Sequence, residues 1–192
     1  MADQLSARDW LDVGLKALAA NGFTALKAEP LAKALKVSRG SFYWHFADLN
    51  AYHAAVLVHW REVTAERVIA DLETTPEGES ALEVLLRRTF SGRLALERAV
   101  RSWATSDAQA RAAVQAIDRR RLDYVELLLR KAGQPGDIAQ ARAQILYWAF
   151  IGYALSDKPL PKARQEMVLG ELMGIALRQD DTRKQAVLEA GR

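Results

Sequence analysis

Apolar residues recur every three or four positions along most of this chain, and no stretch alternates like a half-buried β-strand. In the clearest run, Leu49, Tyr52, Val56, Trp60 and Val63 fall on one side of a helix. Turn residues interrupt the pattern at "NG", "TTPEGES", "GQPG" and "DKPLP". The sequence therefore predicts an all-α protein of about nine helices, at residues 6–21, 28–35, 38–46, 48–73, 79–91, 93–105, 108–132, 136–157 and 161–179. We expect the polar end, 180–192, to be frayed or weakly helical.

Composition excludes several classes of protein. The 192 residues include no cysteine, so disulfides, thiol chemistry and a Cys-ligated metal are impossible. The three histidines lack the spacing of a metal site, and we expect no metal and no cofactor. No apolar run reaches the roughly 20 residues that cross a bilayer, and the N-terminus lacks the pattern of a secretory signal. We therefore expect a cytoplasmic protein with no membrane partner.

The first part of the chain predicts a helix-turn-helix. Ser6 is placed to cap a helix that ends at "NG", 21–22, and a short helix at 28–35 accommodates Pro30 in its first turn. A turn at Val37 and Ser38 leads to a second short helix, for which Ser38 is the expected cap. In this arrangement the second short helix enters the DNA major groove. We predict a DNA-binding domain at 1–47 and a helical body at 48–192, joined by a long helix that Asp48 caps.

The segment "VSRGSFYWHF", 37–46, combines core residues with a candidate DNA face. Phe42 and Phe46 lie four positions apart and are expected to point inward, with Leu31, Ala34, Leu35 and Val37 as partners. Two adjacent rings, Tyr43 and Trp44, cannot both share that inward face on so short a helix. The alternative is that the whole aromatic run is core beneath a loop, with His45 as a core or capping histidine.

Positive charge is concentrated in this same region, although the net charge of the chain is only +3. Between 27 and 45 four cations face a single carboxylate, Glu29, which favours a surface that contacts phosphates. Arginine is also suited to the edge of guanine. The candidate DNA-binding residues are Lys27, Lys33, Lys36, Ser38, Arg39, Gly40, Ser41, Tyr43, Trp44 and His45.

Residues 8–60 resemble the DNA-binding head of the TetR (tetracycline-repressor) family, whose pattern contains "aGVs.gtlY.HF". The matching positions are Gly22, Phe23, Leu31, Ala32, Val37 to Tyr43, His45, Phe46 and, loosely, Tyr52. Three positions depart from the pattern: Lys27 replaces a capping Thr, Lys36 replaces the Gly of the turn, and Leu49 replaces a Lys. The two gained lysines can add phosphate contacts, so the contacts with DNA need not copy those of relatives.

The resemblance implies that the body binds a small-molecule effector. Large rings in the middle helices could line a mostly apolar cavity, with an arginine to orient the ligand. The candidates are Trp60, Phe90, Arg101, Trp103, Tyr124, Tyr147 and Phe150. The alternative for each ring is ordinary core packing. No catalytic constellation or phosphate-binding loop appears in this part of the sequence, and we expect no enzyme activity.

The resemblance also implies a homodimer formed by the last two long helices, 136–157 and 161–179. These helices carry an apolar stripe and two glycines four positions apart, a spacing that lets helices approach closely. The candidate interface residues are Ile145, Trp148, Gly152, Leu155, Val168, Gly170, Leu172 and Gly174. The alternative is that the same stripes pack within one chain.

Together these features predict a transcriptional regulator that binds double-stranded DNA as a homodimer, at a near-palindromic operator. We expect a repressor that a small molecule releases from DNA. Two alternatives remain. One is a constitutive regulator whose body only dimerises, and the other is an all-α small-molecule carrier or enzyme with a vestigial head.

Overall fold

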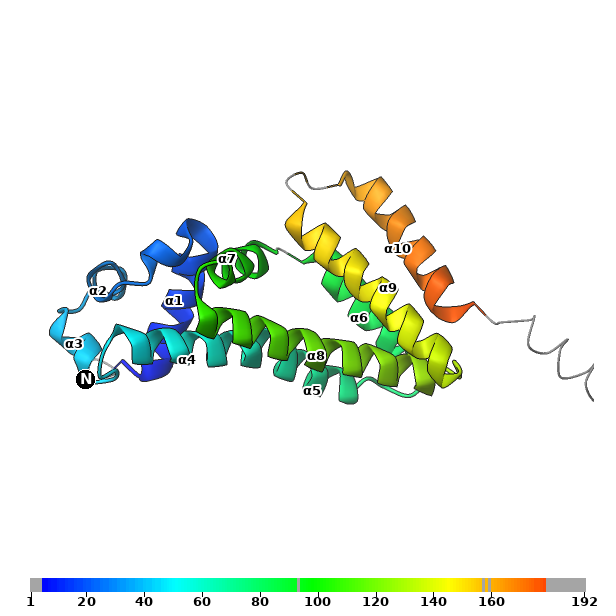
Figure 1. The fold of residues 1–192 in the computed structure, drawn as a ribbon, viewed down its shortest axis with the longest axis horizontal. Coiled ribbons are helices and arrows are strands. Elements are labelled where there is room, and N and C mark those ends of the chain that lie inside the picture. The colour runs from blue at the N-terminus through cyan, green and yellow to red at the C-terminus, as the bar shows by residue number, and fades with distance from the viewer. Residues whose placement is uncertain (1–4, 93, 157, 159, 179–192) are drawn as a thin grey trace, which may run out of the picture. The chain divides into compact units, whose positions relative to one another are not determined.

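The computed structural model describes residues 5–92, 94–156, 158 and 160–178, so the predicted frayed end lies outside the described residues. Within these ranges the regular structure is entirely helical, as predicted, and no strand occurs (Figure 1). The elements are α1 (Ala7–Asn21), a 3₁₀ turn (Phe23–Ala25), α2 (Ala28–Leu35), α3 (Gly40–Tyr43), α4 (Leu49–Arg61), a π-helical segment (Glu62–Glu66), α5 (Arg67–Glu73), α6 (Ala81–Ser91), α7 (Ala95–Ala104), α8 (Ala108–Lys131), α9 (Gly136–Leu155) and α10 (Lys162–Leu177).

The chain forms two compact units. The first unit consists of residues 1–74 and 92–121, and the second of residues 75–91 and 122–192. The first unit therefore contains the predicted head, α4, α5, α7 and the first part of α8. The second contains α6, the end of α8, α9 and α10.

An aromatic cluster fixes the head of the first unit. The Phe42 ring is fully buried and meets Trp10 of α1 edge-on at 5.4 Å and Tyr52 of α4 at 5.1 Å. The Tyr52 hydroxyl donates a hydrogen bond of 2.9 Å to the Trp10 carbonyl, and burial raises the pKa of Tyr52. Gly14 makes room for this hydroxyl, because a Cβ there would lie 2.0 Å from it. One ring thus joins three helices.

Two of the predicted helix caps are confirmed. At the start of α1, Ser6 and Asp9 form a reciprocal capping box, and the hydrogen bonds from Ser6 lower the pKa of the Asp9 carboxyl. At the start of α4, the Asp48 carboxylate accepts a hydrogen bond of 2.7 Å from the Ala51 amide.

The second short helix differs from the prediction. It begins at Gly40 and ends at Tyr43, and the Ser38 side chain does not cap it, because Arg39 occupies the N-cap position. Ala34, expected in the core beside Phe42, is exposed, and Ala32 is the buried alanine of α2. The eight residues of α2 place positions 31 and 32 toward α1, which turns position 34 outward.

The predicted helix at 48–73 is continuous but contains the π segment, which the sequence did not indicate (Figure 1). The Arg67 amide hydrogen-bonds the Glu62 carbonyl, five residues back. A π segment of this length occurs mostly as a local bulge in an α-helix and is frequent at functional sites.

In the second unit, α10 packs along α6 and α9. The Gln165 side chain donates hydrogen bonds to the Phe90 carbonyl and the Tyr153 hydroxyl, which ties α10 to both neighbours. The Arg142 guanidinium donates to the carbonyls of Ala176 and Arg178 at 3.2 and 2.6 Å. These bonds satisfy carbonyl groups at the end of α10 that have no partner within the helix.

Lys36 ends α2 in the left-handed conformation, with φ 59° and ψ 38°. Among the described residues it is the only one other than glycine with a positive φ. The side chain costs free energy here, since the left-handed conformation disfavours a Cβ by about 1–2 kcal/mol. Lys36 is the position at which the pattern of the family that this segment resembles has the glycine of the turn.

We predict that Lys36→Gly stabilises the protein by about 1 kcal/mol, because glycine adopts this conformation without strain. The free energy of unfolding in urea measures the effect. Lys36→Ala is the matched control: it removes the same charge but keeps the Cβ, and should give no stabilisation. Equal stability of the two variants would show that the backbone at this turn is not strained.

Candidate functional site

The outer face of the helix-turn-helix is strongly exposed. Trp44 is 88% exposed and Tyr43 is 46% exposed, whereas Phe42 and Phe46 on the other side are buried. Ser38, Arg39 and Gly40 are also exposed, and Ser41 and His45 are half-buried. The exposure of Trp44 excludes the alternative in which the whole aromatic run is core. A bulky indole held in solvent by a buried neighbour is typical of a binding surface.

A surface groove of about 550 Å³ lies beside this face, in the first unit. It contains three cationic side chains and one carboxylate, Glu29, and is bounded by the start of α2 and by Tyr43. No side chain caps the start of α2, where Lys27 stands in the N-cap position. The lining residues are Lys27, Ala28, Glu29, Pro30, Lys33, Arg39, Tyr43 and Leu49. Its charge and its backbone amides suit it to a phosphate.

Arg39 and Tyr43 interact across one turn of this groove wall. The Arg39 Nη2 donates a hydrogen bond of 3.3 Å to the Tyr43 hydroxyl, and the guanidinium carbon lies 5.9 Å from the centre of the ring. The hydrogen bond to Tyr43 raises the pKa of Arg39 above its ordinary value.

The remaining cations of the predicted DNA face, Lys27, Lys33 and Lys36, are all exposed. Lys27 and Lys33 line the groove with Arg39, and Lys36 stands at the end of α2. The structure thus places all ten candidate DNA-binding residues in the first unit, between the start of α2 and His45.

The candidate effector residues fall into two groups. Trp60, Arg101 and Trp103 belong to the first unit, and Phe90, Tyr124, Tyr147 and Phe150 to the second. All six rings are buried. The indole N–H groups of Trp60 and Trp103 have no hydrogen-bond acceptor within the described part of the chain. Trp103 stacks on Phe23 at 4.6 Å and forms part of the wall of a second surface groove, of about 660 Å³, along α1 and α7.

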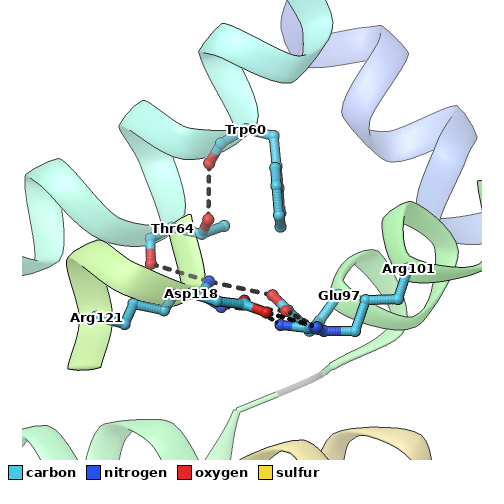
Figure 2. Close-up of polar contacts among 6 residues, drawn as sticks. All are labelled: Trp60, Thr64, Glu97, Arg101, Asp118 and Arg121. Carbon is cyan, nitrogen blue, oxygen red and sulfur yellow. Dashed lines mark hydrogen bonds and ion pairs between the residues drawn. The ribbon is translucent and has the colours of Figure 1, made fainter. Parts of the chain in front are cut away.

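Arg101 lies in a buried ion-pair network (Figure 2). It donates to Glu97 at 2.8 Å and to Asp118 of α8 at 2.6 Å. Arg121, also of α8, donates to both oxygens of Glu97 at 3.1 Å, so one carboxylate that is only 5% exposed bridges two guanidinium groups. Arg101 was predicted from the sequence without these partners, and the i, i+4 spacing of Glu97 and Arg101 was the signal for one of them.

This network contacts the π segment. Arg121 Nη2 donates to the Thr64 carbonyl at 3.4 Å, and its guanidinium lies 5.9 Å from the Trp60 ring centre. The Thr64 hydroxyl in turn donates to the Trp60 carbonyl at 2.7 Å (Figure 2). Ion pairs between α7 and α8 therefore extend to the irregular part of the long helix.

The α9 and α10 surfaces match the candidate dimer interface in part. Trp148 is 66% exposed, and Ile145, Gly152 and Leu155 on the same stripe are exposed as well. On α10, Val168, Gly170 and Gly174 are exposed, whereas Leu172 is buried within its own unit. A Cβ at Gly152, Gly170 or Gly174 would meet no atom within 4 Å, so these glycines leave open space at the surface.

The described residues contain neither a candidate membrane span nor a candidate metal site. No helix there is long and apolar enough to cross a membrane. No cluster of three His, Cys, Asp or Glu side chains in those ranges could hold a metal ion.

Residues 11–48 match the family model of the bacterial regulatory proteins of the tetR family. The fold is similar to that of a transcriptional regulator assigned to the TetR/AcrR family, with a TM-score of 0.76, 22% identity, and coverage of 88% of this chain and 97% of that chain. It is also similar to Escherichia coli NemR in its reduced form, with a TM-score of 0.72, 20% identity, and coverage of 88% and 96%.

A third similar structure is Bacillus subtilis FadR in complex with stearoyl-CoA, with a TM-score of 0.65, 17% identity, and coverage of 87% and 97%. At these identities the likeness establishes a shared fold. No curated protein matches the sequence significantly.

The family model thus covers the helix-turn-helix at residues 11–48, and the all-α fold is shared with these regulator structures.

We predict that Glu97→Ala destabilises the protein by about 3–5 kcal/mol, because it leaves two buried guanidinium groups without their shared carboxylate. Urea denaturation measures the change. The matched control is Glu83→Ala, which breaks an exposed i, i+4 pair with Arg87 and should cost no more than about 0.5 kcal/mol. A similar loss in both variants would show that the buried network is not a major source of stability.

Proposed function

We propose that the protein is a repressor that binds a near-palindromic operator as a homodimer and leaves it when a small molecule binds. In this proposal residues 1–47 form the DNA-binding domain, and residues 48–192 bind the ligand and dimerise. The observation that carries it is the exposed pair of Trp44 and Arg39, which a buried Phe42 holds at the surface of the helix-turn-helix. No catalytic role is assigned.

We assign different tasks to the residues of the DNA face. Lys27, Lys33 and Lys36 contact phosphates and supply affinity for any sequence. Arg39 reaches the edge of a guanine, with Ser41 beside it, and Gly40 allows close approach to the groove. Tyr43, Trp44 and His45 contact the backbone at the end of α3, and Ser38 does so at its start.

The first test is selection of binding sites from a random duplex pool, followed by two variants on the selected site. Arg39→Ala should cost about 1–3 kcal/mol and relax the preference at one base pair of each half-site. Lys33→Ala, the control for a phosphate contact, should weaken binding to all sequences and reduce the salt slope by about one. If no motif is enriched, or both variants behave alike, Arg39 does not read a base.

The dimer is proposed to form through α9 and α10. Support comes from the exposed Trp148 and the open surface at three glycines, which would allow helices of two protomers to approach closely. A two-fold dimer presents two recognition helices to half-sites about 34–36 Å apart, which accounts for a near-palindromic operator. Leu172, buried within its unit, would support this surface from beneath.

We predict that Trp148→Glu weakens dimerisation by at least about 30-fold, since a central tryptophan typically contributes more than 2 kcal/mol to an interface. Sedimentation equilibrium measures the dissociation constant. Val58→Glu is the control, because Val58 is a comparably exposed apolar residue of α4 outside the proposed interface. A dimer that tolerates Trp148→Glu as well as it tolerates Val58→Glu would require another interface.

Release by a ligand is proposed to act through the helix that contains α4 and α5. B. subtilis FadR, which shares the fold, has been crystallised with stearoyl-CoA. A ligand need only bind more tightly to a conformation that misaligns the two heads. The proposed wall of the site is the group of buried rings within the second unit, Phe90, Tyr124, Tyr147 and Phe150. A compound that binds the protein but leaves operator affinity unchanged would contradict release by that compound.

A further inference from the structure

We propose that Tyr43 is a positioning residue for Arg39: its hydroxyl holds the guanidinium in the orientation in which Arg39 meets a base, and links that base contact to a phosphate contact. The inference deepens the proposed function and rests on the assignment of Arg39 as a base reader.

The first step of the argument is that Tyr43 is itself held. Its ring meets the buried Phe42 ring edge-on, with centres 5.3 Å apart and planes at 82°. Phe42 is in turn packed against Trp10 and Tyr52. The Tyr43 ring therefore has a fixed position relative to the core, although its hydroxyl end is exposed.

The second step is that Arg39 is held by Tyr43. The two residues are four positions apart, so they lie on one side of the short α3 helix. The hydrogen bond of 3.3 Å and the approach of the guanidinium to the ring, at 5.9 Å, act on the same group. An exposed arginine otherwise samples many rotamers, and fixing one of them on binding costs affinity. Arg39 is already partly ordered before DNA arrives.

The third step is that the contact leaves both groups able to bind DNA. A guanidinium has five N–H donors, and the bond to Tyr43 uses one of them, so donors remain for guanine O6 and N7. The tyrosine hydroxyl accepts from Arg39 and keeps its own hydrogen, which it can donate to a phosphate oxygen. Both residues line the same groove with Lys27 and Lys33, which are suited to hold that phosphate.

The test uses Tyr43→Phe, which keeps the ring and its contact with Phe42 and removes only the hydroxyl. The measured quantity is a ratio: affinity for the selected operator divided by affinity for an operator altered at the base pair that Arg39 reads. We expect Tyr43→Phe to lower this ratio about two- to tenfold. Loss of a phosphate contact alone would weaken both operators equally and leave the ratio unchanged, which would overturn the inference.

A double-mutant cycle separates this inference from the proposal on which it rests. In an Arg39→Ala background, Tyr43→Phe should leave the ratio unchanged, because no guanidinium remains to be positioned. If Arg39→Ala itself alters no base preference, the assignment of Arg39 as base reader fails, and the inference fails with it. If Arg39→Ala alters the preference and Tyr43→Phe does not, only the positioning role of Tyr43 is overturned. Equal thermal melting of the variants confirms that the fold is intact.

Discussion

The surface that we propose to face DNA depends on the burial of one ring, that of Phe42. A helix of four residues such as α3 has no stability of its own, because its few hydrogen bonds do not compensate for the entropy lost in forming it. Contacts of Phe42 with α1 and α4 hold it in place, and the hydroxyl of Tyr52 fixes α1 against α4 through the Trp10 carbonyl. These contacts of Phe42 therefore determine the direction in which the exposed residues of α3 point.

A second constraint operates where the long helix departs from α-helical geometry. Two carboxylates and two guanidinium groups compensate one another in a largely buried network, and one guanidinium reaches the Thr64 carbonyl. Charges that are removed from water tolerate little displacement, since a lost partner is costly. In the proposed release, movement of the long helix past α7 and α8 would therefore proceed between discrete arrangements of these pairs. This property suits the proposed release, in which the protein is either bound to DNA or free of it.

Much of the fold could be read from the sequence because its determinants are local. Helix periodicity gave the helices to within a few residues, and short-range hydrogen bonding placed Ser6 and Asp48 as caps. The inward direction of Phe42 and Phe46 followed from their spacing. The π segment could not be predicted, since no local pattern signals it, and Arg121, which contacts the Thr64 carbonyl within it, lies 57 positions away. The contact of Arg101 with Asp118 could not be predicted either, because the two residues are far apart in the sequence. The length of α3 could not be predicted because tertiary contacts, rather than a cap, set its ends.

The five tryptophans divide in a way that makes the protein optically informative. Trp10, Trp60 and Trp103 are buried, whereas Trp44 at the end of α3 and Trp148 on α9 are exposed to solvent. A water-soluble quencher therefore reduces the fluorescence of two indoles. Trp44 lies on the face that we propose to bind DNA, and Trp148 lies on the face that we propose to bind the second protomer. Replacing either of them by phenylalanine leaves a single accessible fluorophore. Operator engagement and subunit association can then be followed independently in the unlabelled chain.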